Sequence, residues 1–488
     1  MNESRVAIVT EGRTFTYADL EQASAQVAAS LLGPSDDLQE ARAAYLIPPG
    51  FEYAAVQRGI WRAGGVGVPL AVTHPPPELD YVIRDTAAAF VIGTAATAGV
   101  LMPLAAAAGA RFVAAEDLLA DATPGPAVRP HLGPTRRAMI VYTSGTTSRP
   151  KGVVTTHAAI GAQVAALVEA WEWRPTDRLL LTLPLHHVHG IVNGLASALA
   201  VGATCEIQPS FDARGVWDRF GSGEITVFTA VPTIYHRLIA VWEAEAPAVQ
   251  RVWAEGARRA RLMMSGSAAL PVQTLARWHA ITGQTLLERY GMTELGMALS
   301  NPLHGPRRPG FVGTPLPGVD VRLVDDEGTL VPDGVPGELE VRGPNVFLEY
   351  WGRPAETAAA FRDGWFRTGD MAVVEGGAYR LLGRTSVDII KTGGYKVSAL
   401  EIEEVLRQHA AIRECAVVGI SDAEWGQRVA AVVELVPGAE LTSGALQQWA
   451  GERLAPYKVP RLMCTVEALP RNTLGKVLKA EVARLFRE

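Results

Sequence analysis

The residues best suited to chemistry lie in one short segment, 142–152, which reads Tyr-Thr-Ser-Gly-Thr-Thr-Ser-Arg-Pro-Lys-Gly. Such a segment can hold a polyphosphate, because glycines let backbone N–H groups approach the oxygens while hydroxyl groups and a lysine add donors and charge. The candidate contacts are Thr143, Ser144, Gly145, Thr146, Thr147 and Lys151. The segment is not the ordinary P-loop, whose lysine is followed by Ser or Thr. A Ser/Thr/Gly-rich surface turn is the alternative interpretation.

The bulk composition narrows the class of protein and its partners. The chain has 488 residues, enough for several domains. Its 45 Lys and Arg against 51 Asp and Glu residues give a net charge of −6, so we expect no nucleic acid or membrane partner, only small molecules. Three scattered cysteines, Cys205, Cys415 and Cys464, favour a reducing compartment, with the cytoplasm as the default.

Residues 86–110 are the one stretch that resembles a membrane span. They carry no charge, but Gly93, Gly99, Pro103 and Gly109 interrupt them and most of the rest are small. This pattern predicts a strand, a turn and a helix rather than a span. The first five residues lack the apolar core of a secretory signal, so no export is expected.

The elements that would position such a loop follow a repeating order. Short apolar runs give way to a loop and then to a helical pattern, as in 43–47 before 51–63 and 225–231 before 233–242. This alternation predicts an α/β fold of mostly parallel sheets covered by helices, in which ligands bind beyond the carboxyl ends of the strands. From about residue 320 the runs are shorter and separated by Gly and Pro, which predicts a β-rich subdomain of hairpins.

A compact α+β pattern follows the hairpins. An apolar strand at 387–390 precedes a helix capped by Ser398, with Glu401 three residues further on, and then a strand at 415–418. We therefore expect two domains, a large one over residues 1–383 and a small, hinged one over 384–488.

Further segments join the phosphate loop in a fixed order. They are 184–190 (Pro-Leu-His-His-Val-His-Gly), 265–270 (Ser-Gly-Ser-Ala-Ala-Leu), 290–294 (Tyr-Gly-Met-Thr-Glu), 366–370 (Phe-Arg-Thr-Gly-Asp), 383–395 and the pair 475–476 (Gly-Lys). Together they resemble the superfamily of adenylate-forming enzymes, which includes acyl-CoA synthetases, adenylation domains of peptide synthetases and firefly luciferase. The resemblance covers essentially the whole chain.

Within that superfamily the chain is most similar to malonyl-CoA synthetases. The similarity is carried by segments 230–237, 288–294 and 383–397. One departure is Ser148, where the family usually has glycine in the phosphate loop. If that position needs a positive φ, the loop is strained or rearranged.

The resemblance implies a reaction in two halves. A carboxylate attacks the α-phosphate of ATP to give an acyl-adenylate and pyrophosphate, and the thiol of coenzyme A (CoA) then displaces AMP. Because two anions must meet in the first half, a cation is needed between them, and the family match assigns Lys476 to this role. Mg²⁺ would shield the remaining phosphates, with Glu294 and Thr146 as its ligands and Thr293 as a donor to the α-phosphate.

The family match also implies contacts for the nucleotide and for CoA. The adenine is expected to stack on the ring of Tyr290, with Asp370 on the ribose hydroxyls and Arg384 on the ribose or a phosphate. Taken singly, these three would be interpreted as a core aromatic, a turn residue and a surface charge. The other expected contacts are Gly266, Ser267, Ala268, Ala269, Glu288, Arg289, Gly291 and Met292 for the nucleotide, and Gly393 and Gly394 for CoA.

Arg237 indicates the class of acid. It lies in the first turns of the helix after the strand at 225–231, where its side chain can reach the crevice at the strand ends. A guanidinium buried beside an acyl pocket is costly unless an anion meets it, and its planar fork suits a carboxylate. We therefore expect malonate as the substrate, with methylmalonate also accepted. An exposed helix arginine is the alternative interpretation.

The remaining pocket residues come from the family match. His187 is the gate-like histidine expected near the reacting carboxylate, and the rest of the pocket wall is expected from Ser265, Gly266 and Met297. His186, His187 and His189 could also suggest zinc, but no cysteine or acidic partner lies nearby in the sequence.

Domain alternation and two rival functions complete the expectations. The C-terminal domain should pivot within 384–387, so that Lys476 serves adenylation and the 393–395 loop serves thioester formation. The rivals are an adenylating ligase that acts on another small carboxylate or delivers its product to a carrier protein, and a non-catalytic nucleotide sensor. Acetylation of Lys476 would stop adenylation, which would make an acetyltransferase and a deacetylase partners of the chain.

Overall fold

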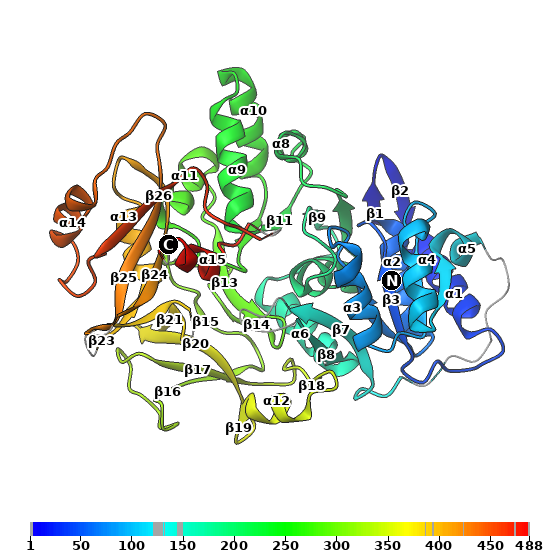
Figure 1. Cartoon of the computed structure of the whole chain (residues 1–488). Helices are drawn as coiled ribbons and strands as arrows, with labels where there is room; N and C mark the ends of the chain where they lie inside the picture. The colour runs from blue at the N-terminus through cyan, green and yellow to red at the C-terminus, as the bar shows by residue number, and fades with distance from the viewer. Residues whose placement is uncertain are drawn as a thin grey trace.

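The computed structural model contains sheets with helices packed against them, in a large domain and a small C-terminal domain (Figure 1). The described residues are 3–120, 130, 132–143, 150–385, 387–392, 395–422, 424–472 and 475–486, and the side chain of Lys396 is also left out. Within these ranges no helix is long and apolar enough to cross a membrane.

A nine-stranded sheet forms the centre of the large domain, in the order β15-β14-β13-β12-β11-β9-β10-β1-β2. Its strands are β1 (Val6–Thr10), β2 (Arg13–Thr16), β9 (Arg178–Leu181), β10 (Thr204–Ile207), β11 (Val227–Ala230), β12 (Leu262–Ser265), β13 (Leu287–Met292), β14 (Gly296–Ser300) and β15 (Thr314–Pro315). The strands from β13 to β1 in this order are parallel, and only the edges are antiparallel. Ala230 pairs with Ser265, and Ser265 with Glu288, so these strands end at one edge of the sheet.

A seven-stranded sheet lies beside it, in the order β18-β8-β7-β4-β3-β5-β6. Its strands are β3 (Arg42–Leu46), β4 (Val66–Pro69), β5 (Phe90–Gly93), β6 (Arg111–Ala114), β7 (Arg137–Thr143), β8 (Lys151–Thr156) and β18 (Glu349–Tyr350). The predicted phosphate loop is a hairpin connection here, since Thr143 on β7 pairs with Lys151 on β8. The sequence interpretation made the loop too long, because its two ends belong to strands.

Helices cover both parallel sheets, as the alternation of apolar runs predicted. They are α1 (Tyr17–Leu32), α2 (Phe51–Arg62), α3 (Pro76–Asp85), α4 (Ala98–Ala108), α5 (Ala115–Ala120), α6 (His157–Ala170), the π-helix η1 (His189–Ala196), α7 (Ser197–Ala200), α8 (Ala213–Gly221), α9 (Pro232–Glu243), α10 (Pro247–Arg258) and α11 (Val272–Thr282). Between α8 to α11 and the sheet, Trp217 and Tyr235 pack on Trp278 with ring centroids 5.3 and 4.9 Å away. Tyr235 also donates to the Met264 carbonyl at 2.8 Å, which fixes α9 on β12.

An antiparallel sheet follows in the chain, as the Gly and Pro punctuation predicted. It consists of β16 (Asp320–Val324), β17 (Gly337–Arg342), β19 (Phe361–Arg362), β20 (Trp365–Glu375) and β21 (Ala378–Arg384), with the short helix α12 (Pro354–Ala359) beside it. Asp370 on β20 pairs with Arg384 on β21. The last strand of this sheet therefore leads from the nucleotide-site candidates directly into the C-terminal domain.

The small C-terminal domain has the predicted α+β character. It contains β22 (Ile389–Thr392), β23 (Tyr395–Ser398), α13 (Ala399–Leu406), β24 (Ile412–Asp422), β25 (Gly426–Leu435), α14 (Ser443–Gly451), β26 (Leu462–Val466) and α15 (Lys479–Arg484). The predicted cap is confirmed, since the Ser398 hydroxyl accepts from the Glu401 amide at 3.2 Å. The strands bury their own apolar clusters on both faces of the sheet, so this domain has a core separate from that of the large domain.

Candidate functional site

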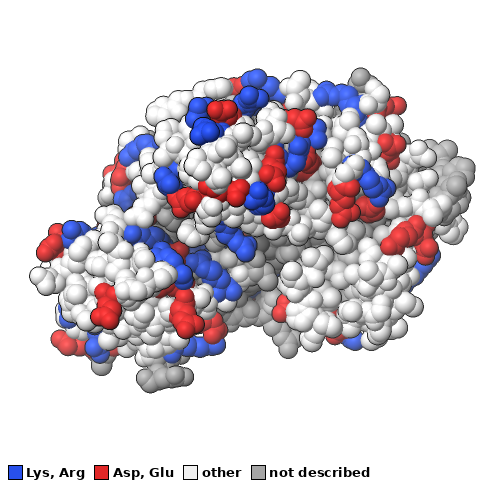
Figure 2. Space-filling view, turned by 90° about the horizontal axis from the view of Figure 1, so that it is seen from above, with Lys and Arg blue, Asp and Glu red and all other residues white. Residues whose placement is uncertain are grey.

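A cavity of about 1960 Å³ lies between the carboxyl-end edge of the nine-stranded sheet and the C-terminal domain. Figure 2 shows the surface hollowed between two lobes, with Lys and Arg side chains of one lobe facing the hollow. Predicted site residues on its wall come from both domains: Arg237, Ser265, Ser267, Ala268, Ala269, Glu288, Arg289, Tyr290, Gly291, Met292, Asp370, Arg384 and Lys476. The fold thus brings together segments that are far apart in the sequence.

Arg289 is the most unusual residue of this wall. Its side chain lines the cavity although the residue is only 3% exposed. No described carboxylate pairs with it, and its Nε and Nη1 atoms have no hydrogen-bond partner in the described part of the chain. Burial lowers the pKa of Arg289. Since an unpaired buried guanidinium is costly, this arrangement is suited to receive an anion.

His189 holds one end of that guanidinium. Its Nε2 accepts a hydrogen bond from Arg289 Nη2 and lies 2.7 Å from Thr229 Oγ1, while its Nδ1 lies 3.0 Å from Ser267 Oγ. Because an arginine only donates, Nε2 must be the acceptor and Nδ1 carries the proton. Burial holds the pKa of His189 well below its usual value, so the ring stays neutral.

The backbone around Arg289 is shaped to admit it. A Cβ at position 266 would overlap the guanidinium, so Gly266 is required there by the close approach of the side chain. The next residue, Ser267, has a φ of 68°, which is strained for a residue other than glycine. Gly266 therefore contributes by leaving room for the guanidinium of Arg289.

Two hydroxyl groups nearby are also unused. Ser265 Oγ and Thr182 Oγ1 are buried, line the cavity and have no hydrogen-bond partner among the described residues. Ser265 ends β12, and Thr182 follows the last residue of β9, so both lie at the carboxyl-end edge of the sheet. Buried hydroxyl groups normally have a partner, which marks this edge as polar space for a ligand.

A second group of residues, Tyr290, Asp370 and Arg384, is mutually paired. Tyr290 donates to one carboxylate oxygen of Asp370 at 2.5 Å, and Arg384 Nε lies 3.2 Å from the other. Burial raises the pKa of Asp370, and Arg384 opposes that rise. The charges of this group also act on Lys476. Burial, and then the positive charge of Arg384, lower the pKa of Lys476, while the carboxylates of Asp388 and Asp370 oppose that shift.

The segment that carries Lys476 reaches across to the large domain. A Cβ at position 475 would lie 2.8 Å from Thr233 Oγ1, at the start of α9. Gly475 has a φ of 77°, and its carbonyl accepts from Arg471 Nη1 at 2.7 Å. In this orientation Lys476 lines the same cavity as Arg289.

Glu294 lies close to this group but not on the cavity wall. Its carboxylate is buried and accepts a hydrogen bond from the Tyr350 hydroxyl at 3.0 Å, and burial raises its pKa. Lys151 lies 5.0 Å above the ring of Tyr350 and pairs with Glu356. The lysine of the phosphate loop is therefore directed at a carboxylate in this structure, on the same side as Glu294.

Arg237 is not buried as the sequence interpretation required. It lines the cavity, but it is exposed, and its guanidinium lies 5.5 Å from the centre of the Phe211 ring. It follows the first turn of α9, on the side of the helix that faces the open space. Arg237 thus lies at the accessible part of the wall, whereas Arg289 lies at its buried part.

Two of the predicted histidines pack on each other at the cavity. His186 lines the cavity, and the ring of His187 lies 4.2 Å from that of His186. Burial lowers the pKa of His187 to about 4 and that of His186 to about 3, so both are neutral at pH 7. Within the described residues no cluster of three or more His, Cys, Asp or Glu side chains could hold a metal.

The other predicted residues lie around the cavity or outside the described residues. Met297 is 2% exposed and lies behind Gly291, where a Cβ would contact it, so it does not line the cavity. Thr293 precedes Glu294 in the turn after β13, and Thr143 ends β7. The predicted contacts that lie outside the described residues are Ser144, Gly145, Thr146, Thr147, Gly393 and Gly394, together with Ser148.

Comparisons with known proteins agree with this architecture. Residues 1–351 match the model of the AMP-binding enzyme family, and residues 401–476 match that of the AMP-binding enzyme C-terminal domain. The chain belongs to the AMP-binding enzyme family. The resemblance to adenylate-forming enzymes and the predicted fold class are thereby confirmed.

The relatives of this AMP-binding enzyme include proteins named as malonate–CoA ligases. It is 46% identical to the mitochondrial malonate–CoA ligase of Xenopus laevis, over 98% of this chain and 89% of the relative, and 40% identical to the malonate–CoA ligase of Arabidopsis thaliana, over 98% and 86%. ATP-bound MatB from Rhodopseudomonas palustris is 34% identical and superimposes with a TM-score of 0.92, over 100% of this chain and 97% of that one. A malonyl-CoA ligase in a product complex with methylmalonyl-CoA and AMP is 37% identical, with a TM-score of 0.70 over 96% and 97%.

Sequence reasoning missed three features of the site. It did not predict the contact of Arg289 with His189, and it did not assign His186 and Thr182 to the cavity that they line. For His186 and Thr182 the available signal was their position after the strand β9, at the carboxyl-end edge of the sheet.

Proposed function

We propose that the chain is an ATP-dependent malonate–CoA ligase. It would convert malonate, ATP and CoA to malonyl-CoA, AMP and pyrophosphate through a malonyl-adenylate, and would also accept methylmalonate. In the first half-reaction a carboxylate oxygen forms a bond to the α-phosphorus and pyrophosphate leaves with the electron pair of the broken P–O bond. In the second, the CoA thiol loses its proton to solvent and its sulfur forms a bond to the acyl carbon, while the bond between that carbon and the AMP oxygen breaks and AMP leaves with the electron pair.

One observation carries the choice of a dicarboxylate, namely the unpaired guanidinium of Arg289. A monocarboxylate spends its only charge on the reaction with ATP and leaves a buried cation unpaired. Malonate has a second carboxylate, which can accept hydrogen bonds from the free Nε and Nη1 atoms. Ser265 and Thr182 supply unused hydroxyl donors on the same wall. Arg237, on the exposed part of the wall, would guide the anion inward.

Lys476 would supply the charge between malonate and ATP. Its position on the cavity wall, together with the higher TM-score against the ATP-bound relative than against the CoA-product complex, supports a domain orientation suited to adenylation. His186 and His187 are neutral at pH 7, so neither adds to this positive charge. No general base is needed in this half-reaction, because malonate is already ionised.

The paired group would hold the rest of the nucleotide. Adenine would stack on Tyr290, and Asp370, oriented by Tyr290 and Arg384, would accept bonds from the ribose hydroxyls. Glu294 fits Mg²⁺, because a single protein carboxylate that acts together with phosphate oxygens suits this ion, and Thr146 would be its second protein ligand. When bound, Mg²⁺ neutralises charge on the phosphates.

Three further predictions accompany this function. The domain boundary would lie between residues 383 and 384, and the pivot within 384–387, with Gly393 and Gly394 approaching CoA after rotation. The cytoplasm remains our expectation for the compartment, although the Xenopus relative is named as mitochondrial. Reversible acetylation of Lys476 would make an acetyltransferase and a deacetylase partners of the enzyme.

The direct test is AMP formation from ATP that depends on both CoA and Mg²⁺, measured in parallel with malonate, methylmalonate, succinate, acetate and octanoate. We expect malonate to exceed acetate and octanoate by at least about 100-fold in kcat/KM, since a buried unpaired charge penalises acids that lack the second carboxylate. A preference for a monocarboxylate would leave an adenylating ligase but overturn the assignment of malonate. If AMP forms with none of these acids, the carrier-protein or sensor functions would be favoured instead.

A further inference from the structure

Helix α11 begins without a cap of its own. Its N-cap residue is Pro271, which has no side chain able to accept a hydrogen bond, and the first turn contains no acidic residue. The first amides of a helix have no partner within it and together favour a negative charge. The start of α11 therefore needs an acceptor from elsewhere.

The C-terminal domain supplies that acceptor. The carboxylate of Glu404, on α13, faces the backbone amide of Val272, the first residue of α11, and this amide opposes the rise that burial causes in the pKa of Glu404. Next to it, Gln273 Nε2 donates to the Arg407 carbonyl at 2.9 Å. All four residues line the cavity between the two domains. The end of one helix in the mobile domain thus covers the start of a helix in the large domain.

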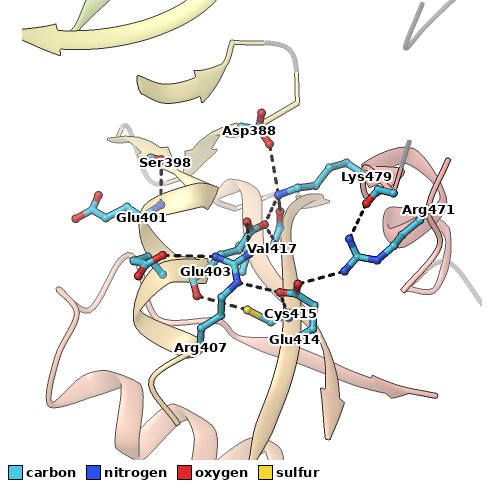
Figure 3. A network of polar contacts seen from close by, with 12 residues as sticks. Asp388, Ser398, Glu401, Glu403, Arg407, Glu414, Cys415, Val417, Arg471 and Lys479 are labelled. Atoms are coloured by element: carbon cyan, nitrogen blue, oxygen red, sulfur yellow. Dashed lines mark hydrogen bonds and ion pairs between the residues drawn. The ribbon is translucent and has the colours of Figure 1, made fainter. Parts of the chain in front are cut away.

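The same end of α13 is rigidly connected to the loop that carries Lys476. Arg407 Nε donates to Glu414 at 2.9 Å, and the other oxygen of Glu414 lies 3.2 Å from Arg471 (Figure 3). Arg471 in turn donates to the Gly475 carbonyl at 2.7 Å. The amide of Lys476 donates to Asn472 Oδ1 at 2.9 Å, which holds the other side of the loop.

The other charges around Glu404 do not replace its contact with α11. Arg407 Nη1 lies 3.8 Å from its carboxylate, but Arg407 is also paired with Glu403 and Glu414. Glu288, from the large domain, faces Glu404 across the cavity, and this repulsion does not favour docking. The amide of Val272 is thus the contact by which Glu404 favours this orientation of the domains.

We propose that Glu404 and Gln273 form a latch that selects the domain orientation in which Lys476 enters the cavity, which makes both of them positioning residues for adenylation. The inference rests on the proposed two-step reaction. When the domain rotates for thioester formation, Glu404 leaves α11 and both contacts break. The latch therefore stabilises the first half-reaction and is absent from the second.

Measuring the two half-reactions separately tests the latch. Malonate-dependent exchange of labelled pyrophosphate into ATP reports adenylation, and CoA consumption from chemically prepared malonyl-adenylate reports thioester formation. Glu404→Ala should lower the exchange rate about 10-fold, the effect of losing an interdomain helix cap. Gln273→Ala should lower it about 3-fold, the effect of one lost hydrogen bond. Thioester formation should stay within about twofold of wild type in both variants.

Two further variants separate positioning from folding. Glu404→Gln retains an acceptor for the Val272 amide and should recover most of the exchange rate. Glu452→Ala serves as the matched control, because Glu452 is an exposed residue of the same domain that pairs with Arg453 at 3.0 Å. Equal losses in both half-reactions, or wild-type exchange in Glu404→Ala and Gln273→Ala, would overturn the latch. Absence of malonate-dependent exchange in the wild type would instead overturn the proposed function.

Discussion

The two walls of the cavity each bury a cation, and they treat it in opposite ways. Lys479, in the C-terminal domain, contacts Glu403, the Val417 carbonyl at 2.6 Å and Asp388 at 3.4 Å. Arg289, in the large domain, has one contact, to the neutral His189, and two unused nitrogen atoms among the described residues. Arg289 is 3% exposed and the side chain of Lys479 is 11% exposed, so both charges depend mainly on partners in the protein or in a ligand.

The contrast separates a scaffold from a binding site. A buried charge whose hydrogen bonds are all made stabilises one geometry, here that of the elements around the Lys476 loop. A buried charge whose bonds are left open costs free energy unless a ligand completes it. The predictions below depend on this difference between Lys479 and Arg289.

Replacing Lys479 should have the largest effect on stability. Lys479→Met removes the cation beside Asp388 and leaves Glu403 with Arg407 as its remaining cation, and we expect the C-terminal domain to lose about 3 kcal/mol of unfolding free energy. Denaturant unfolding followed by a probe in that domain measures it. Arg484→Met is the matched control, since Arg484 is on the same helix, has a 68% exposed side chain and pairs with Glu481.

Arg289→Met should not destabilise the protein in the same experiment. It removes an uncompensated buried charge and leaves an apolar side chain of similar length, so the unfolding free energy should stay the same or rise. A loss of several kcal/mol in Arg289→Met would mean that its charge is already paired within the fold. The comparison between the two walls would then be wrong.

Replacing Lys476 should separate the half-reactions most strongly. Lys476→Ala should lower malonate-dependent pyrophosphate exchange by about 10²–10³-fold, because it removes the charge that stabilises the meeting of two anions. Thioester formation from prepared malonyl-adenylate should be largely retained. Single-turnover measurements of each half-reaction give the two rates. Equal losses in both would contradict the division of labour between the half-reactions.

Glu288 should give a smaller, pH-dependent effect. Burial raises the pKa of Glu288 to about 8 in the folded protein, so between its ordinary value and pH 8 the unfolded chain releases a proton that the folded chain keeps. Folding stability should therefore fall as the pH rises through this window, by on the order of 1 kcal/mol between pH 6 and 7. In Glu288→Gln that part of the decrease should vanish, as thermal unfolding at several pH values can measure. An unchanged pH dependence would show that Glu288 is ionised in the fold.

The sequence predicted the fold and most of the segments of the site. Ordered motifs identified the family, and alternating apolar runs predicted parallel strands such as β11 followed by α9. These features are local or depend on motif order, so no tertiary contact had to be known. The cap at Ser398 was predicted for the same reason.

The roles of the individual arginines could not be predicted in this way. Arg237 was expected to be buried, but burial depends on which distant element covers a helix face. Among the described residues the Phe211 ring lies 5.5 Å from its guanidinium, and Arg237 stays exposed. Arg289 was grouped with Tyr290 because the two are adjacent in a motif, and its contact with His189, 100 residues earlier in the chain, follows from no local pattern. The latch of Glu404 and Gln273 depends on the orientation of two domains, which no local pattern contains.

The role of the unpaired Arg289 guanidinium is tested most directly by the ratio of kcat/KM for malonate to kcat/KM for acetate. This ratio is measured in wild type, Arg289→Met and Arg237→Met. We predict that Arg289→Met reduces the ratio by about 100-fold or more, through the loss of two charged hydrogen bonds. Arg237→Met, at the exposed part of the wall, should reduce it by no more than about 10-fold. An unchanged ratio in Arg289→Met, with ATP binding intact, would contradict the assignment of a dicarboxylate substrate to this buried guanidinium.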